Sequence, residues 1–539
     1  MPTSSHALLS VLRAHGVDRV FLVPGESYLG ILDALNEFPD IDIVTCRHES
    51  GAGFMACADG RLTRRAGVAV VSRGPGASNA TIALHTAQQD AIPMILIIGQ
   101  VPRSHLRQEA FQEIDYQQAY GSIAKWVVEV TEPAQLAAAA FKAVRIATTG
   151  TPGPVVLVVP EDVQQQAVDA PAWRAMPPAR TVADPETLDQ LHRLLDGAAR
   201  PLIIAGNALD APGGREALLA LAEQRQIPVM VSFRRQDLFP NDHPLYAGDL
   251  GLANPREQIA ALEESDLILA LGTRLGDITT QGYTFPDCPW PRQALVHCYP
   301  DTRQIGLHFA ARVGLACDPT LLARALRGPG PYPASDARQA WVQRLRALHE
   351  GLARWPGAQS SHLIFSEVVQ AVKHHAAPDA IIAVDAGTFA VPAYQNFSFM
   401  PPQRLMAPIS GAMGYGVPAA IATQLRHPGR KVVCLVGDGG FMMTGNEMIH
   451  AIERQLPIVF ILANNARYGS IRKHQDTVYP GRHLGTSLYN PCLRDLAASF
   501  GLRSDRLIHS AQVDALIGDA MADKVPRFIE VMIETPQST

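Results

Sequence analysis

Short apolar runs recur along the chain, and longer stretches between them alternate apolar and polar positions with a helical period. In the first third the runs fall at residues 20–23, 41–45, 68–71, 94–98 and 155–159. Uninterrupted runs of this length are typical of strands buried on both faces, as in parallel sheets. Their alternation with helical segments predicts a parallel-sheet α/β domain over residues 1–165.

The same alternation occurs twice more. The runs fall at residues 201–205, 228–232, 267–271 and 294–298 in the middle, and at 381–385, 431–436, 457–463 and 527–533 in the last third. A Pro/Ala-rich stretch, residues 166–185, predicts a linker after the first domain, and a polar stretch precedes the last. We expect a middle domain over residues 186–340 and a C-terminal domain over 358–539. The expected fold class is α/β with three doubly wound parallel-sheet domains, because 539 residues are too many for one core.

The composition narrows the class of protein. Apolar residues make up 47% of the chain and charged residues 18%, and the net charge of −5 disfavours a nucleic-acid partner. The most apolar run, residues 92–98, is too short to cross a bilayer, so no membrane partner is expected. The seven cysteines form no CxxC pair, and the start of the chain lacks the long apolar segment of a secretory signal. We therefore expect reduced, mostly buried thiols in a cytoplasmic protein.

The strongest candidate chemistry surrounds the strand predicted over residues 431–436. The sequence GDGG follows at residues 437–440, where glycines let backbone amides face an anion. After a predicted helix over residues 443–454 comes a second strand, so Asp438 and Asn465 both stand at carboxyl ends of strands, where open α/β sheets bind ligands. A carboxylate and an amide oxygen suit Mg²⁺, which also takes phosphate oxygens. Taken alone, both residues are equally suited to be turn residues.

Gly437-Asp438-Gly439 together with Asn464-Asn465 resembles the metal and diphosphate motif of thiamine diphosphate (ThDP) enzymes. The wider resemblance is to the acetolactate synthase-like family, which includes pyruvate oxidase and 2-oxo acid decarboxylases. It implies a pyrimidine-binding first domain, a Rossmann-like middle domain, and a last domain that binds diphosphate and Mg²⁺. It also implies a homodimer or homotetramer, with active sites shared between subunits, that acts on small 2-oxo acids.

Glu49 begins a predicted helix, residues 50–61, directly after the strand over residues 41–45. By itself, a glutamate in this position is more often a helix cap or a partner of the helix dipole. The resemblance implies instead that Glu49 hydrogen-bonds N1′ of the cofactor's aminopyrimidine and shares a proton with it. That role needs a carboxyl in an apolar setting, where desolvation raises its pKa. General acid–base catalysis of this kind contributes about 10²–10⁴-fold to a rate.

Two further residues complete the catalytic set. Gln112 lies in the FQE sequence at residues 111–113, which resembles the family segment whose glutamine reaches the cofactor-bound intermediate. A surface loop residue is the alternative for Gln112. Met413, in a glycine-rich turn, matches the large apolar residue that holds the cofactor bent, although a methionine is more often core filler.

The resemblance implies three sets of site residues. The cofactor-binding residues are Pro24, Glu49, Gly74, Asn79, Gly387, Thr388, Gly411, Met413, Gly437, Asp438, Gly439, Gly440, Asn465, Tyr468 and Gly469. The metal ligands are Asp438, Asn465 and the backbone carbonyl of Arg467. The residues that face the substrate are Glu26, Ser27, Gln112 and Ile471, although Glu26 is equally suited to cap the helix after it.

The resemblance also concerns a nucleotide site in the middle domain, which in relatives holds FAD, ADP or nothing. The flavin segment of acetolactate synthases usually reads RFDDR, whereas residues 274–278 read RLGDI. We therefore expect ThDP and Mg²⁺ as cofactors and do not favour FAD.

Decarboxylation of a 2-oxo acid followed by carboligation, as in acetolactate synthases, is the function we expect. Decarboxylation alone, giving an aldehyde, is the alternative, because the tryptophan that acetolactate synthases carry after the metal segment is missing here. A nicotinamide-dependent dehydrogenase is disfavoured, since no GxGxxG sequence follows the first predicted strand. A non-catalytic homologue is disfavoured as well, because Glu49, Asp438 and Asn465 are all present.

Overall fold

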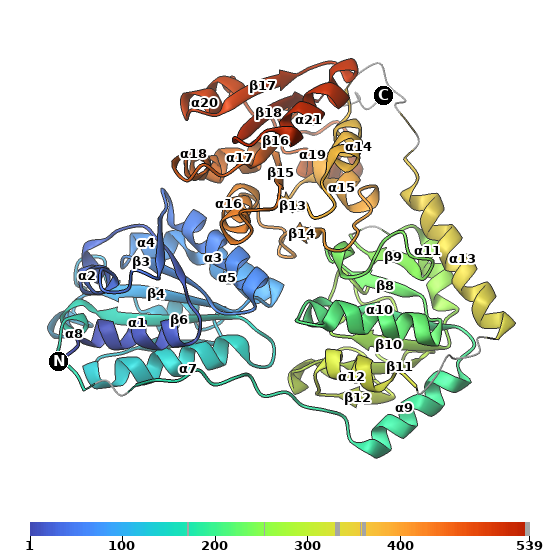
Figure 1. Ribbon diagram of the computed structural model, residues 1–539, viewed down its shortest axis with the longest axis horizontal. Coiled ribbons are helices and arrows are strands. Elements are labelled where there is room, and N and C mark those ends of the chain that lie inside the picture. Colours follow the sequence, from blue (N-terminus) through green and yellow to red (C-terminus); the bar gives the residue numbers. More distant parts are fainter. Residues whose placement is uncertain (170–171, 253, 329–334, 356, 358–362, 534–539) are drawn as a thin grey trace.

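The computed structural model describes residues 1–169, 172–252, 254–328, 335–355, 357 and 363–533. They form three six-stranded sheets in which every pairing is parallel. Helices flank each sheet (Figure 1), which confirms the predicted α/β fold class. Within the described ranges, no helix combines the length and apolarity needed to cross a membrane.

The first sheet has the strand order β2-β1-β3-β4-β6-β5. Its strands are β1 (Arg19–Leu22), β2 (Asp42–Thr45), β3 (Gly67–Val71), β4 (Met94–Gln100), β5 (Trp126–Glu129) and β6 (Pro154–Pro160). Its helices are α1 (Ser4–Ala14), α2 (Leu29–Leu35), α3 (Glu49–Thr63), α4 (Pro75–Asn79), α5 (Thr81–Asp90), α6 (Tyr116–Tyr120), α7 (Leu136–Thr148) and α8 (Glu161–Gln164).

The middle sheet has the order β12-β11-β10-β7-β8-β9. Its strands are β7 (Pro201–Ala205), β8 (Val229–Ser232), β9 (Tyr246–Leu250), β10 (Leu267–Leu271), β11 (Ala294–Cys298) and β12 (Val313–Leu315). The helices beside it are α9 (Pro185–Gly197), α10 (Gly214–Arg225), α11 (Arg256–Glu263), α12 (Pro319–Ala325) and α13 (Asp336–Ala353).

The last sheet has the order β14-β13-β15-β16-β18-β17. Its strands are β13 (Ile381–Val384), β14 (Arg404–Met406), β15 (Val432–Gly437), β16 (Val459–Asn464), β17 (Arg503–Leu507) and β18 (Arg527–Met532). Its helices are α14 (Phe365–His375), α15 (Val391–Gln395), α16 (Gly416–Arg426), α17 (Asp438–Thr444), α18 (Ile449–Glu453), α19 (Gly469–Val478), α20 (Leu493–Ser499) and α21 (Val513–Ala522).

Every predicted strand is present, but the apolar runs miss β5, β9, β12, β14 and β17. All five lie at the edges of their sheets. An edge strand has a neighbour on one side only, so its residues need not be uniformly apolar. The sequence of β17, RSDRL, has one fully buried position, and β12 and β14 are three residues long. Such strands leave no run of apolar residues from which to predict them.

The prediction of one helix over residues 443–454 is wrong. The helical segment starts earlier, and a 3₁₀ turn divides it into two α-helices. α17 begins at Asp438, a 3₁₀ turn follows over Gly445–Met448, and α18 ends at Glu453. The GDGG sequence is therefore the end of β15 and the first turn of a helix, and its backbone N–H groups are those of a helix N-terminus. The other predicted helix, residues 50–61, corresponds to α3 with a slightly earlier start.

Helices α3 and α16 join the first and last domains, and Figure 1 shows them next to each other. Both contribute alanines to one buried cluster, which lets their backbones approach closely. The Phe54 ring packs edge-on against Tyr415 with 5.7 Å between centroids. Arg426 of α16 donates to the carboxylates of Asp59 in α3 (3.0 Å) and Asp18 (2.8 Å). The two domains are thus fixed by a continuous core and a charged border.

A buried charge network joins the middle and last domains. The Asp237 carboxylate accepts hydrogen bonds from Arg215 (2.7 Å), Arg404 (3.3 Å) and the backbone N–H of Leu405 (3.1 Å). Burial alone would raise the pKa of Asp237, but the two guanidinium groups lower it below its usual value. The Asp237 carboxylate therefore stays ionised, because the guanidinium groups of Arg215 and Arg404 surround it.

We expect Asp237→Asn to lower the melting temperature markedly, because it leaves two partly buried guanidinium groups undercompensated. Breaking a buried pair costs about 3–5 kcal/mol. The control is Asp287→Asn, which removes the exposed partner of Arg292 and is expected to cost less than about 1 kcal/mol. Scanning calorimetry of both variants is the measurement. Equal shifts in the two variants would contradict the importance assigned to this domain junction.

Candidate active site

A cavity of about 350 Å³ lies at the carboxyl ends of β13, β15 and β16. Every residue predicted for the site in the last domain lines it. These residues are Gly387, Thr388, Gly411, Met413, Gly437, Asp438, Gly439, Gly440, Asn465, Arg467, Tyr468, Gly469 and Ile471. The position agrees with the rule that open α/β sheets bind ligands beyond the carboxyl ends of their strands.

Asp438 and Asn465 follow two adjacent strands. β15 and β16 pair so that Gly437 lies opposite Ala463, and each candidate ligand comes just after its strand. Asp438 is 3% exposed, and burial raises the pKa of its carboxyl above the usual value. The Asn465 side-chain oxygen accepts the backbone N–H of Arg467 at 3.2 Å. This set of oxygen donors in one cavity fits Mg²⁺, whose charge would favour the ionised form of Asp438.

Asn490 is a site residue that the sequence did not reveal. Its side-chain amide donates to Asp438 (2.7 Å) and to the side-chain oxygen of Asn464 (3.0 Å). It thereby fixes the orientation of the candidate ligand carboxylate, as outer hydrogen-bond partners do in metal sites. A single asparagine between α19 and α20 has no neighbouring motif, so only the folded chain shows its role.

Asp385 holds the glycine-rich loop against the start of α17. Its buried carboxylate accepts the backbone N–H of Gly414 at 3.0 Å, and burial raises its pKa to about 6. Gly414 has a φ of +85°, which favours glycine. A Cβ at Gly440 would lie 2.6 Å from an Asp385 oxygen, so this position needs glycine for close packing. These contacts hold the loop whose Met413 lines the cavity.

The predicted residues of the first domain gather at the carboxyl end of the first sheet. The Glu49 carboxylate accepts the side-chain amide of Asn79 at 2.9 Å. A Cβ at Gly74 would lie 2.7 Å from the carbonyl oxygen of Gln112, which places these two residues in contact. Ser27 accepts the backbone N–H of Arg73 at 3.1 Å, on the same edge.

Gln112 is exposed and has a φ of +64°, an uncommon conformation for a residue other than glycine. Phe111 beside it is 78% exposed. A positive φ in a residue other than glycine is found preferentially at functional sites.

Within one chain the two groups of predicted residues remain separate. The seven first-domain residues, all inside the described ranges, do not line the last-domain cavity; they are Pro24, Glu26, Ser27, Glu49, Gly74, Asn79 and Gln112. These two separate groups of predicted residues, here termed half-sites, each lie at the carboxyl edge of their own sheet.

Glu447 links the two half-sites and was also missed by the sequence. It is fully buried, and its carboxylate accepts the backbone N–H groups of Arg47 (3.0 Å) and His48 (2.9 Å). These two residues directly precede Glu49, so the last domain holds the start of α3 in place. His450 contacts the same carboxylate at 3.2 Å. In the sequence Glu447 is one polar residue in a helical stretch, without a signal of burial.

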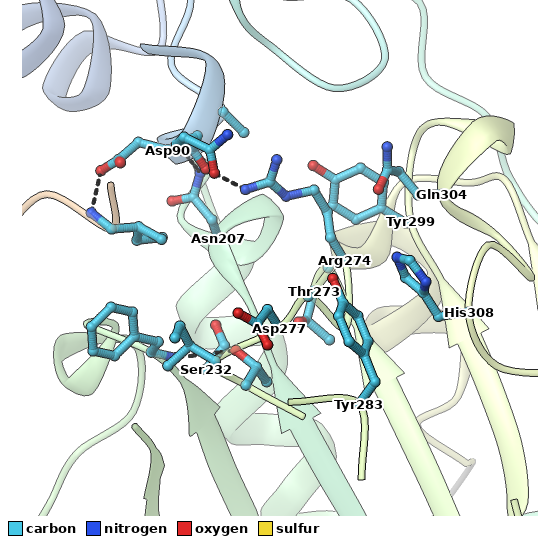
Figure 2. A pocket seen from close by; sticks show the side chains of 18 residues that line it. Asp90, Asn207, Ser232, Thr273, Arg274, Asp277, Tyr283, Tyr299, Gln304 and His308 are labelled. Atoms are coloured by element: carbon cyan, nitrogen blue, oxygen red, sulfur yellow. Dashed lines mark hydrogen bonds between the residues drawn. The ribbon is translucent and has the colours of Figure 1, made fainter. Parts of the chain in front are cut away.

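A second cavity, of about 310 Å³, lies between the first and middle domains (Figure 2). It contains the segment that departs from the flavin sequence. The Arg274 guanidinium already donates to the backbone carbonyl of Gln89, and Figure 2 shows the Asp277 side chain facing the cavity. The Asp277 carboxylate would repel the diphosphate of FAD, and the Arg274 guanidinium is turned to the neighbouring domain. These residues therefore fit FAD poorly. The volume is at the lower end for small-molecule sites.

Three family models match the chain: the N-terminal TPP binding domain of thiamine pyrophosphate enzymes at residues 2–119, the central domain at 188–326, and the C-terminal TPP binding domain at 385–531. It is 31% identical to the acetolactate synthase large subunit of Parasynechococcus marenigrum, over 98% of this chain and 87% of the relative. It is also 31% identical to the large subunit of acetolactate synthase isozyme 1 of Escherichia coli, over 99% and 94%. The chain belongs to the thiamine pyrophosphate enzymes and is acetolactate synthase-like over nearly its whole length.

Proposed function

We propose that this protein uses ThDP and Mg²⁺ to decarboxylate a 2-oxo acid and to ligate the remaining fragment to a second carbonyl compound. The observation that carries the proposal is the convergence of all thirteen predicted last-domain residues on one cavity. Decarboxylation alone, with an aldehyde as product, is the alternative. FAD is not part of the proposal.

The last domain would hold the polar end of the cofactor. Asp438, Asn465 and the carbonyl of Arg467 would bind Mg²⁺, and the N-terminus of α17 offers backbone N–H groups to a diphosphate. Met413 lines the same cavity and would support the thiazolium ring. When bound, ThDP supplies a carbon nucleophile that takes up electrons as CO₂ leaves.

Glu49 would act as the proton-holding group at N1′ of the aminopyrimidine. Asn79 donates to one oxygen of Glu49 and so orients the carboxyl. Gln112 belongs to the same half-site and would contribute an amide that reaches the reacting atoms. Glu26, Ser27 and Ile471 are the further residues proposed to face the substrate.

The separation of the half-sites supports a homodimer or homotetramer. Glu49 and its neighbours would complete the cavity of a second copy of the chain, and the exposed Phe111 would be covered in that assembly. Small 2-oxo acids are the proposed partners and the cytoplasm is the proposed location.

The direct experiment is product analysis. Purified protein with ThDP and Mg²⁺ would be given pyruvate and then larger 2-oxo acids, with CO₂ and organic products measured. An acyloin is the expected product. An aldehyde as sole product would favour the alternative, and CO₂ release without dependence on ThDP would contradict the proposal.

We expect Glu49→Gln to reduce kcat at least about 10²-fold, because a proton-transfer group is lost. ThDP affinity should change little, since the amide keeps the size and packing of the side chain. The matched control is Glu186→Gln, which also removes an acidic residue from the first turn of a helix but lies on the surface of α9. Undiminished turnover by the Glu49 variant would disprove its role.

Asp438→Ala is expected to abolish Mg²⁺-dependent ThDP binding, because it removes the charged metal ligand. Asn490→Ala should weaken that binding by only about 10–100-fold, the usual effect of removing a hydrogen-bond partner of a ligand. Isothermal titration calorimetry with ThDP, with and without Mg²⁺, measures both variants. Unchanged affinity in the Asp438 variant would rule out the proposed metal site.

A further inference from the structure

The guanidinium of Arg234 is a buried cation without a carboxylate partner. Arg234 is 4% exposed and lies just after β8, at the carboxyl end of the middle sheet. Among the described residues, its side chain makes one hydrogen bond, from Nη1 to the carbonyl of Pro408, and no ion pair. Its Nε is buried and has no partner there. Buried charges are normally paired, so this position lacks an anion.

Two aromatic rings hold the guanidinium, and the buried carboxylate of Asp385 interacts with it through space without forming an ion pair among the described residues. The guanidinium lies 4.8 Å from the ring centroid of Phe233 and 5.3 Å from that of Tyr394. Aromatic faces attract a cation but leave its N–H groups free to donate. Arg234 also has a φ of +55°, a conformation that costs free energy in a residue other than glycine and is found preferentially at functional sites.

Two other arginines where the middle and last domains meet do pair with carboxylates. Arg215 and Arg404 both donate to Asp210, at 3.0 Å and 2.8 Å. Both also contact Asp237, as described above. The buried carboxylates of this junction are therefore already used, and none of them pairs with Arg234 in the part of the chain that the structure describes.

Arg234 lines two adjoining cavities. One is the active-site cavity, which it shares with Met413 and Asp438. The other has a volume of about 410 Å³ and also contains Tyr394, whose buried hydroxyl has no hydrogen-bond partner among the described residues. Leu252 belongs to both linings. An anion at Arg234 would thus lie at the wall of the active site. The Arg234 Nε and the Tyr394 hydroxyl are the two groups without partners that could bind it.

The charge balance of this second cavity also favours an anion. Among its described lining residues the charged cations are Arg234 and Lys473, and the single carboxylate is Asp249. Burial raises the pKa of Asp249 to about 7, so near neutral pH it carries only part of a negative charge. His349 is neutral, because burial lowers its pKa to about 4.

On the basis of the proposed function, we propose that Arg234 binds a second acidic group of the substrate, remote from the reacting carbon. The carboxylate that leaves as CO₂ is a poor candidate, because an ion pair would stabilise its charge more in the ground state than in the transition state. The substrate class is therefore a 2-oxo acid, or an acceptor, that carries a further carboxylate or a similar anion. The diphosphate of ThDP is the other anion that enters this cavity, and the test separates the two.

The test uses calorimetry on the full-length protein loaded with ThDP and Mg²⁺. Glutarate and pentanoate are the probes, since they have equal chain lengths and differ only in the second carboxylate. Wild type should bind glutarate at least about tenfold more tightly, as expected for a hydrogen-bonded charged group. Arg234→Met should remove this preference and Arg234→Lys should keep part of it.

Lys473→Met is the control. It removes an exposed cation from the same lining, and solvent screening should limit its effect to about twofold. The melting temperature of each variant shows that the fold is kept; a destabilised Arg234→Met variant would be replaced by Arg234→Gln.

The outcomes separate the proposals. A glutarate preference that disappears in Arg234→Met, with unchanged ThDP affinity, supports the second acidic group. Weaker ThDP binding in this variant would show that the guanidinium serves the diphosphate, and would overturn the substrate assignment. Equal binding of the two probes by wild type, or an unchanged preference in the variant, would also overturn it. Failure of the proposed function would appear separately, as missing ThDP binding or missing CO₂ release.

Discussion

The buried carboxylate of Glu447 is the contact on which the arrangement of the site depends. A carboxylate at 0% exposure is stable only when hydrogen bonds replace its water, and here the backbone of Arg47 and His48 supplies two of them. Those donors belong to the turn that leads into Glu49. Together with the packing of α3 against α16, the contact fixes the first half-site relative to the last domain of the same chain. The two half-sites nevertheless lie at different sheet edges, so the proposed complete site requires a second chain.

The last-domain half-site follows from parallel-sheet geometry and from one buried aspartate. Adjacent parallel strands end at the same edge, which places Asp438 beside Asn465. Asp385 then ties the glycine-rich loop to the start of α17 through Gly414, and the absence of a side chain at Gly440 allows that close packing. The middle domain adds Arg234 to the wall of the same cavity. All three sheets would thus contribute to the proposed chemistry, and the proposed metal ligands all follow strands of the last one.

The buried strands could be predicted from the sequence, and the motif residues could be proposed from it, because both leave local patterns. The continuous apolar stretches within β4 and β15 are visible as runs, whereas β17, with three charged residues in RSDRL, is not. The start of α17 was misplaced because glycines disfavour helices in general, yet here they form the first turn of one. Asn490, Glu447 and Arg234 were missed for a different reason. The roles proposed for them rest on contacts with residues far away in the chain, and nothing near them in the sequence indicates those contacts.

The central claim is that Glu49 of one chain and Asp438 of another form one active site. The most direct measurement mixes two inactive variants, Glu49→Gln and Asp438→Ala, after subunit exchange under mild denaturation. In a mixed dimer one site would have both wild-type residues and the other neither. Random pairing should therefore restore about a quarter of wild-type activity, as the symmetry of a shared site requires. Activity that stays at the level of the separate variants, with subunit exchange shown by mass spectrometry, would contradict the claim.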